Sequence, residues 1–285
     1  MTILDDLADY ARLRSLHDQE TIPYSQMRQT AEALVDGAGC GHFAFEDALR
    51  GPGIHFICEC KKASPSKGLI SPDFPYKQIA RDYEEAGADA ISCLTEPRWF
   101  QGKDSYVTDI SQTVSIPILR KDFTVDDYMI YQAKVIGASA VLLICALLDD
   151  KTLTAYRQLA ESLGMSALIE AHDADEVKQA VACGGRIIGV NNRDLRTFTV
   201  DIANSMRYRD LVPANAVYVS ESGIHTSDDI RAVYSAGVNA VLIGESLMRS
   251  TNKKGMIAGL RQACEPVADD ATRLSRSTAE VENDR

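Results

Sequence analysis

Eight short and almost continuously apolar runs divide the central part of the chain, and amphipathic segments separate them. Apolar runs without alternation are typical of parallel strands that are covered on both faces. Between them, helical periodicity is clear in 73–85, where Phe74, Ile79 and Tyr83 would share one face. The predicted strands are 54–60, 89–94, 116–121, 139–144, 166–171, 186–191, 216–221 and 239–244.

A helix, a glycine and a strand follow one another repeatedly at a spacing of about 50 residues, or two strand–helix units. Gly87, Gly137, Gly184 or Gly185, and Gly237 fit the left-handed position that ends a helix. Eight alternating units in one domain-length stretch predict an α/β fold, a (β/α)8 TIM barrel. A doubly wound open sheet is the alternative. It would not need such regular spacing, and no G-x-G-x-x-G sequence follows a strand.

The two ends of the chain differ from this repeat. Thr2 is a candidate N-cap for a helix over 3–14, and a second helix is expected over 23–34. Asp, Glu, Arg, Ser and Thr dominate the C-terminal end, which predicts disorder there. The predicted divisions are an N-terminal helical extension packed on the barrel (1–50), the catalytic barrel (51–264) and a polar, disordered tail (265–285).

The composition and net charge of the chain limit the kinds of molecule that it is expected to bind. The chain has 285 residues, 45% of them hydrophobic, and a net charge of −11. An acidic protein is a poor candidate for nucleic acid or an anionic membrane, although a few local groups can still bind a small anion. The longest apolar run, 140–148, is shorter than the roughly 20 residues that span a bilayer. We therefore expect a small-molecule partner, with no nucleic acid and no membrane.

The seven cysteines are scattered, and most lie inside apolar runs. Cys58 and Cys60 are two positions apart, but no second pair accompanies them, so neither a zinc site nor a disulfide framework is indicated. On a strand both would point away from Glu59 and into packing. The N-terminus also lacks a basic and then apolar signal segment. These features predict a reduced, cytoplasmic protein without a metal.

Charged and amide side chains stand where the predicted strands end. In a barrel the C-terminal strand ends meet at one rim, where reactive residues gather. For a single residue, a salt bridge that closes the barrel mouth is an equal alternative, but convergence from nearly every strand favours a functional site. In strand order the residues are Glu59 and Lys61, Thr95 and Glu96, Arg120 to Asp122, Glu170 and His172, Asn191 to Arg193, Ser220 to Gly223, and Gly244 and Glu245.

Lysines and glutamates in one cleft can act as an acid–base pair. A partly desolvated lysine near other cations has a lowered pKa and donates a proton, whereas a glutamate in a dry pocket has a raised pKa and accepts one. His172 would either join the lysine and the glutamate as a third catalytic group or cap the helix that follows it. The loops at Gly223 and Gly244, after the last two strands, are a common phosphate site in barrels.

Seven blocks of the sequence resemble the indole-3-glycerol-phosphate synthase family of tryptophan biosynthesis, over about residues 3 to 262. The blocks are 59–68, 92–102, 117–123, 168–173, 187–198, 219–224 and 240–248. The resemblance implies a carboxy-lyase with no metal or organic cofactor. Such an enzyme closes the ring of 1-(2-carboxyphenylamino)-1-deoxyribulose 5-phosphate and releases carbon dioxide and water to form indole-3-glycerol phosphate.

The same resemblance implies roles for individual catalytic residues. Lys121 would protonate the substrate carbonyl oxygen, and Glu170 would be the general base. Lys61 would pair with the substrate carboxylate and donate a proton in dehydration. Glu59 and Asn191 would orient the substrate, and Ser222 completes the catalytic set.

Substrate-binding residues follow from the resemblance as well. Arg193 and Glu221 would line the site, and Phe123 with the Trp99–Phe100 loop would form an apolar wall for the aromatic ring. Glu245 is an acid beside the expected phosphate, so only its backbone N–H should face the ligand. The residues expected around the phosphate are Ser64, Gly223, Gly244 and Glu245.

Two other functions remain open at this point. A phosphoribosylanthranilate isomerase would need a Cys and Asp pair at the strand ends, where this chain has Lys and Glu. A barrel that has lost catalysis and only senses a ligand is expected to lack Lys121 or Glu170, and both are present. The expected partner is one small phosphorylated substrate, bound by a monomer or a weak homo-oligomer.

Overall fold

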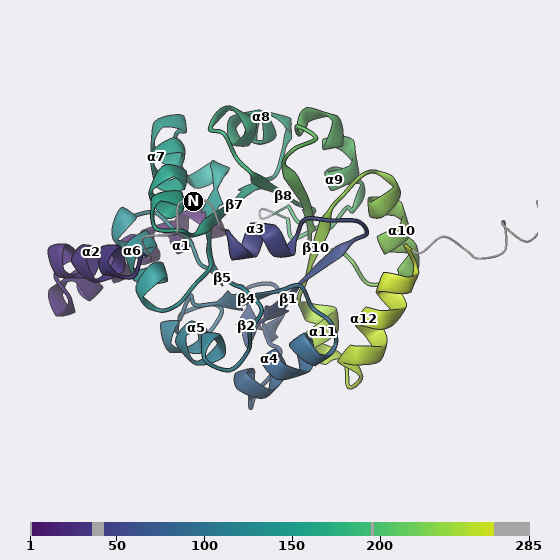
Figure 1. Cartoon of the computed structure of the whole chain (residues 1–285), viewed down its shortest axis with the longest axis horizontal. Helices are drawn as coiled ribbons and strands as arrows, with labels where there is room; N and C mark the ends of the chain where they lie inside the picture. Colours follow the sequence, from purple (N-terminus) through teal and green to yellow (C-terminus); the bar gives the residue numbers. More distant parts are fainter. Residues whose placement is uncertain (1, 36–42, 195–196, 265–285) are drawn as a thin grey trace, which may run out of the picture.

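The computed structural model describes residues 2–35, 43–194 and 197–264. Eight parallel strands close into a barrel in the order β1-β10-β9-β8-β7-β6-β5-β4 (Figure 1). Every predicted strand forms and begins within two residues of its expected start, so the closed barrel replaces the open-sheet alternative. The strands are β1 (His55–Cys60), β4 (Ala90–Leu94), β5 (Ile118–Lys121), β6 (Ala140–Ile144), β7 (Ser166–Ala171), β8 (Ile187–Asn191), β9 (Val217–Glu221) and β10 (Ala240–Ile243).

Helices surround the barrel, as the amphipathic segments predicted (Figure 1). Left-handed glycines end several of them, and Gly184 rather than Gly185 takes that conformation before β8. The helices are α4 (Tyr76–Glu85), α5 (Asp104–Ser111), α6 (Asp127–Val135), α7 (Asp150–Ser162), α8 (Ala174–Ala182), α9 (Ala203–Arg207), α10 (Ser227–Ser235), α11 (Glu245–Arg249) and α12 (Lys253–Gln262), with 3-10 turns η1 (Cys145–Leu147) and η2 (Arg209–Leu211).

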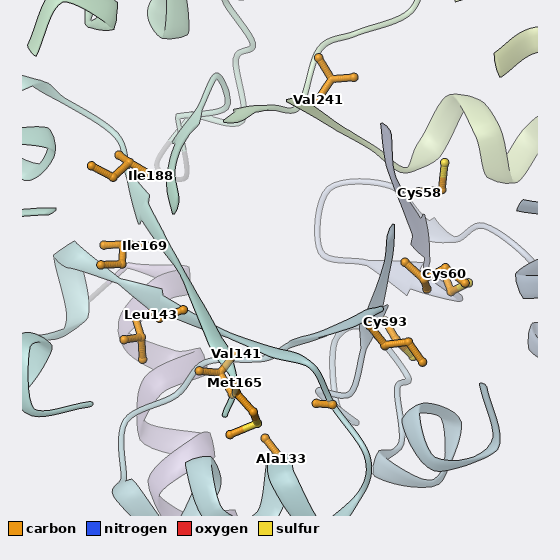
Figure 2. Close-up of a cluster of buried hydrophobic side chains, with 14 of the residues drawn as sticks. Cys58, Cys60, Cys93, Ala133, Val141, Leu143, Met165, Ile169, Ile188 and Val241 are labelled. Atoms are coloured by element: carbon orange, nitrogen blue, oxygen red, sulfur yellow. The ribbon is translucent and has the colours of Figure 1, made fainter. Parts of the chain in front are cut away.

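Alternate residues of each strand face opposite sides of the barrel wall. Ile57, for example, belongs to the cluster inside the barrel, whereas its neighbour Cys58 belongs to the layer between strands and helices. Figure 2 shows Cys58, Cys60 and Cys93 pointing outward from the barrel into that layer. The expectation that Cys58 and Cys60 pack away from Glu59 is confirmed.

The N-terminal segment forms α1 (Ile3–Thr21), α2 (Tyr24–Ala33) and a short α3 (Ala44–Ala48). Thr2 caps α1 as predicted, in a reciprocal capping box with Asp5. The α1 helix runs seven residues beyond the predicted end, and α2 packs against α6. Residues 36–42, which follow α2, and the polar tail lie outside the described residues, so the proposed divisions of the chain stay predictions.

Helix α3 closes one end of the barrel, and the sequence did not predict it. In Figure 1 it lies across the ring of strands. Its Phe45 and Leu49 are buried, and its Glu46 accepts a salt bridge of 2.6 Å from Arg186, directly before β8. This end is therefore the N-terminal end of the strands. A short hairpin of β2 (Ala63–Ser64) and β3 (Gly68–Leu69) stands at the opposite, open end.

No helix in the described part of the chain combines the length and the apolar character that crossing a membrane requires.

Candidate active site

Lys121 lies at the centre of a buried charge cluster at the open end of the barrel. Its Nζ is 2.6 Å from Glu170 Oε2 and 3.4 Å from Glu221 Oε2. The three side chains come from the ends of β5, β7 and β9, at positions that continue the inward-facing series of each strand. Two-residue periodicity therefore explains why groups far apart in the sequence meet inside the barrel.

The cluster shifts two pKa values in directions opposite to those expected. Burial disfavours the ionised form of Lys121, but Glu170 and Glu221 outweigh it and hold its pKa above the ordinary value. Burial would likewise raise the pKa of Glu170, but Lys121 and His172 lower it well below the usual range. The expectation of a lowered lysine pKa and a raised glutamate pKa is wrong for this pair, because each group is the other's counter-ion.

Glu221 is the carboxylate with the raised pKa. Burial and the neighbouring charge of Glu170 raise its pKa to about 7, although Lys121 works in the other direction. Its Oε1 is buried without a hydrogen-bond partner in the described structure. A Cβ on Gly189 would come within 2.2 Å of that oxygen, so a glycine in β8 makes the space that Glu221 occupies. The cluster thus contains one carboxyl group poised to change charge near neutral pH.

Glu59 and Lys61 form a second lysine–glutamate ion pair at the end of β1. A Cβ on Gly244 would lie 2.2 Å from Glu59 Oε1 and 3.0 Å from Lys61 Nζ. The glycine after β10 therefore makes room for the pair, beyond any role for its backbone N–H.

Asn191 connects the cluster to the loop after β8. Its Nδ2 donates to Glu170 Oε1 at 3.0 Å, and its Oδ1 accepts from the Arg193 backbone N–H at 3.0 Å. The following Asn192 donates to Ser220 Oγ and to the Ser222 carbonyl at 2.9 and 3.0 Å. Asn191 therefore holds the Glu170 carboxylate from inside the barrel, whereas Asn192 fixes two neighbouring loops from outside.

An inner cavity of about 140 Å³ lies beside Lys121 and Glu170. Phe100 and Phe123, whose ring centres are 6.0 Å apart, supply aromatic surface. The remaining apolar lining comes from α1, from the barrel strands and from two loops: Ile3, Leu7, Leu94, Leu142, Ile144, Pro65 and Phe198. A flat aromatic group would therefore find an apolar wall next to the charged cluster.

A second cavity of about 410 Å³ adjoins the first, and Glu59, Lys61 and Arg193 line both. Its wall includes the two glycine loops at Gly223 and Gly244. Ser222 and Gly223 both have left-handed backbones, with φ of 69° and 86°. Successive unusual backbone conformations of this kind can present N–H groups to an anion. This cavity has the backbone and the cations for a phosphate.

Ser64 lies in the β2–β3 hairpin, where its Oγ accepts from the Lys67 backbone N–H at 3.2 Å. The Lys67 side chain reaches Glu245 at 3.6 Å, and Arg249 reaches the same carboxylate oxygen at 3.2 Å. These contacts bring the hairpin, which follows β1, to the loop after β10. Both contacts also pair the Glu245 carboxylate with positively charged side chains of the protein itself.

Comparison with known proteins identifies the family. The sequence model of the indole-3-glycerol phosphate synthase family matches residues 12–260. The chain belongs to the indole-3-glycerol phosphate synthase family. The synthase of Ruminiclostridium cellulolyticum is 54% identical over 91% of this chain and 98% of its own, and that of Lacticaseibacillus casei is 50% identical over 91% and 99%. The activity is therefore that of a carboxy-lyase of tryptophan biosynthesis.

Solved structures support the fold. A 3-hexulose-6-phosphate synthase aligns with a TM-score of 0.60 at 14% identity, over 74% of this chain and 100% of its own. A thiamine phosphate pyrophosphorylase from Pyrococcus furiosus aligns with a TM-score of 0.57, also at 14% identity, over 77% and 96%. At this identity the likeness concerns only the barrel architecture of the synthase.

Apart from Trp99, every residue to which the resemblance assigns a role lines at least one of the two cavities. Their placement leaves their individual roles as proposals. One neighbour lies elsewhere: Trp99 does not line either cavity, but packs edge-on against Tyr10 of α1, with ring centres 5.7 Å apart. Only Phe100 of the Trp99–Phe100 loop contributes to the apolar wall. The other residues of the predicted rim line neither cavity: Thr95, Glu96, Arg120, His172, Asn192 and Ser220.

Sequence reasoning missed several residues of the synthase site. Ile3 and Leu7 line the inner cavity from α1, although the apolar face of that helix was visible in the sequence. Glu96 accepts the backbone N–H groups of Arg98, Trp99 and Phe100 at 2.7 to 2.9 Å and so shapes the loop that carries Phe100. The sequence showed that Glu96 follows a predicted strand, but it did not show which backbone N–H groups Glu96 accepts.

His172 does not cap the following helix. Asp173 is the N-cap of α8 and accepts from the backbone N–H groups of Asp175 and Glu176 at 3.0 Å. The capping alternative for His172 is therefore wrong, and its side chain faces Glu170 instead, with Nε2 3.2 Å from Oε1.

Proposed function

We propose that Lys121 is the general acid and Glu170 the general base of the synthase reaction. The observation that carries the proposal is the position of Lys121 Nζ, held 2.6 Å from Glu170 at the wall of the inner cavity. A lysine with a raised pKa stays protonated until an acceptor gains negative charge. It therefore stabilises the transition state for attack on a carbonyl more than the ground state.

The two cavities support one orientation of the substrate. The aromatic ring would lie against Phe100 and Phe123 in the inner cavity, and the phosphate would lie in the outer one. Lys61, which lines both, would hold the substrate carboxylate, with Glu59 keeping its ammonium in place. The ends of the substrate would thus be fixed while its centre reaches Lys121, which converts a flexible chain into a reactive conformer.

The phosphate would bind at the Gly223 and Gly244 loops with Ser64, and Glu245 would contribute only its backbone N–H. The contacts of the Glu245 carboxylate with Lys67 and Arg249 support this arrangement, because they offset a charge that would otherwise repel the ligand. Arg193, Ser222 and Glu221 would line the space between the phosphate and the ring.

The proposed chemistry has three parts. The ring carbon that bears the carboxylate bonds to the carbonyl carbon, and Lys121 protonates the carbonyl oxygen. The bond to the carboxylate then breaks, its electrons return to the ring and carbon dioxide leaves. Finally the new hydroxyl leaves as water after a second protonation, by Lys61 or Lys121, while Glu170 removes a proton from the CH₂ group beside the amine. Asn191 would keep Glu170 aimed at that carbon.

The alternative isomerase chemistry finds no support in these cavities. Its Cys and Asp pair would need an inward-facing thiol, but among the residues that the structure describes no cysteine lines either cavity. Cys58, Cys60 and Cys93 are buried in the layer outside the barrel, where burial raises the pKa of each thiol.

We also propose that the enzyme works in the cytoplasm as a monomer or a weak homo-oligomer, without nucleic acid. The net charge of −11 supports the last point. Size-exclusion chromatography at several protein concentrations tests the oligomeric state. A stable assembly at submicromolar concentration would contradict it.

The test of the proposed function is the appearance of indole fluorescence when the purified protein meets the anilino ribulose phosphate. Lys121→Ala should bind the substrate and lose turnover by orders of magnitude, whereas Lys178→Ala, on the outer surface of α8, should match the wild type. Absence of product with the wild type would contradict the proposal, and normal turnover of Lys121→Ala would remove the acid assignment.

A further inference from the structure

His172 lies between two carboxylates that face opposite directions. Its Nε2 is 3.2 Å from Glu170 Oε1, inside the barrel end, and its Nδ1 is 3.0 Å from Glu176 Oε2, on the first turn of α8. Glu176 Oε2 also accepts the His172 backbone N–H at 2.8 Å, so the ring is held at both its backbone and its side chain. A carboxylate, an imidazole and a second carboxylate therefore follow one another. The contact with Glu176 is a hydrogen bond, whereas the contact with Glu170 is an ion pair in which Nε2–H is not aligned for a hydrogen bond.

Solvent exposure increases along this series, from Glu170 to Glu176. The side chain of Glu170 is 3% exposed, that of His172 is 17% exposed and that of Glu176 is 20% exposed. His172 and Glu176 line a third cavity of about 500 Å³, together with residues of the protein surface such as Thr2 and Asp201. Glu170 does not line this cavity, but it does line the inner one. The imidazole thus stands between the two spaces.

The proposed chemistry needs a proton from outside at every turnover. Two protons convert the carbonyl oxygen into water, and the CH₂ carbon returns only one. The carboxylate leaves as carbon dioxide without a proton. One proton per turnover must therefore enter the site from solvent, and it must reach Lys121 when Lys121 makes both protonations. Of the three cavities, Lys121 and Glu170 line only the inner one, which the aromatic ring of the substrate would fill in the proposed orientation.

We propose that His172 and Glu176 form a proton relay that connects Glu170 and Lys121 with the third cavity. This inference rests on the proposed acid–base roles of Lys121 and Glu170. The Nε2–H bond of His172 breaks as an O–H bond forms on Glu170. This proton is received on Oε1, whereas Lys121 lies 2.6 Å from Oε2. The carboxyl group therefore turns about its Cγ–Cδ bond before the O–H bond breaks and an N–H bond forms on neutral Lys121. Water in the third cavity returns a proton to the imidazole by way of Glu176.

The charge balance of the region supports this direction of transfer. Burial lowers the pKa of His172, but Glu170 and Glu176 outweigh it and raise the pKa to about 10, so the ring is an imidazolium at neutral pH. The pKa of Lys121 lies above its ordinary 10.5, which makes its neutral form the stronger base. Other titratable or charged groups around the ring or its cavity are Asp5, Lys121, Cys145, Asp173, Arg193, Asp194, Asp201 and Glu221.

The first experiment uses His172→Gln, which preserves an amide donor near Glu170 but cannot carry a proton. We expect kcat to fall by about tenfold or more, with KM nearly unchanged and a larger solvent deuterium isotope effect on kcat, because proton supply becomes rate-limiting. Glu176→Gln should show the same pattern more weakly. His55→Gln is the matched control, because His55 pairs with Asp89 near the start of the strands, away from the cavities.

The second experiment distinguishes a proton relay from a role of His172 in positioning Glu170. His172→Ala leaves a space beside the third cavity, and added imidazole should restore its kcat in proportion to the imidazolium concentration. Circular dichroism and thermal unfolding verify that the variants fold. A loss without rescue and without an increased isotope effect would assign His172 to positioning Glu170 and overturn the relay.

Unchanged kinetics of His172→Gln would also overturn the relay. This outcome leaves the acid and base assignments intact, because Lys121→Ala tests them separately. An inactive wild type would instead contradict the proposed function itself. The two failures are therefore distinguishable.

Discussion

Two neighbouring residues of β5 enter two buried charge clusters of different character. Arg120 points out of the barrel, where it is 2% exposed and donates to Asp104 Oδ1 and Gln132 Oε1 at 2.8 and 2.7 Å and to the Met129 carbonyl at 2.8 Å. Lys121 points inward to Glu170 and Glu221. The outward cluster joins structural elements, and only its Asp122 reaches the wall of the inner cavity. Lys121, Glu170 and Glu221 of the inward cluster all line that cavity.

The outward cluster neutralises its charges against one another. Arg14 of α1 reaches Asp122 at 2.7 Å, and Asp122 also accepts from Thr95. Burial would raise the pKa of Asp122, but Arg14 and Arg120 lower it. Inside the barrel, by contrast, Glu221 retains an unpaired oxygen and a pKa raised to about 7. Burial alone therefore does not mark a functional group, whereas incomplete pairing beside an open space does.

The largest effect is expected for Lys121→Met, which removes the ammonium but keeps most of the volume. Because the reacting carbonyl loses its proton donor, kcat should fall by about 10³-fold, while KM changes little. Steady-state kinetics by indole fluorescence measures both constants. A variant that retains a tenth of the wild-type kcat would place the proton donor elsewhere, with Lys61 the next candidate.

Arg120→Met makes the same substitution one residue earlier, on the other face of β5. It leaves buried Asp122 and half-buried Asp104 short of a counter-ion. Losing one partner of a buried pair costs about 3–5 kcal/mol. Urea unfolding should show this loss, while kcat per folded molecule should fall less than about tenfold. If the variant keeps its stability and loses its activity, the division into two clusters is wrong.

The sequence predicted these clusters unequally. The strand positions and the two-residue alternation were enough to place Lys121, Glu170 and Glu221 inside one rim. The pairing distances were not predictable, because they depend on the closure of the barrel and on the space that Gly189 provides. The reversal of the pKa shifts is a consequence of those distances. A lysine that is 2.6 Å from a carboxylate behaves unlike a lysine that is only buried.

The parts of the fold that the sequence did not reveal lie outside the strand–helix repeat. Helix α3 is too short to show a clear helical periodicity of apolar residues. It packs against an end of the barrel that exists only once the barrel has closed. The contact of Arg14 with Asp122 joins positions 108 residues apart, and nothing local distinguishes Arg14 from the exposed Arg12. Long-range partners of this kind can be identified only from the coordinates. The alternation of strand residues and the capping of helices can instead be predicted from neighbouring positions in the sequence.

A smaller and pH-dependent effect is expected for Glu221→Gln. A carboxyl pKa raised from 4.5 to about 7 contributes stability that is full below pH 4.5 and is lost as the pH rises through 7. The amide does not titrate. The variant should therefore match the wild type at pH 5 and exceed it by about 1–2 kcal/mol at pH 8. Urea unfolding at both pH values measures this, and an equal difference at pH 5 and pH 8 would contradict it.

The smallest effect is expected for Gln132→Ala, at the edge of the outward cluster. Gln132 accepts from Arg120 at 2.7 Å and donates to Asp18 of α1 at 3.1 Å, but Arg120 keeps Asp104 and the Met129 carbonyl. Losing these bonds should lower the free energy of unfolding by about 1 kcal/mol, and kcat should not change. A fall in kcat without a fall in stability would mean that the outward cluster adjusts Lys121 through β5, because the two residues share one peptide bond.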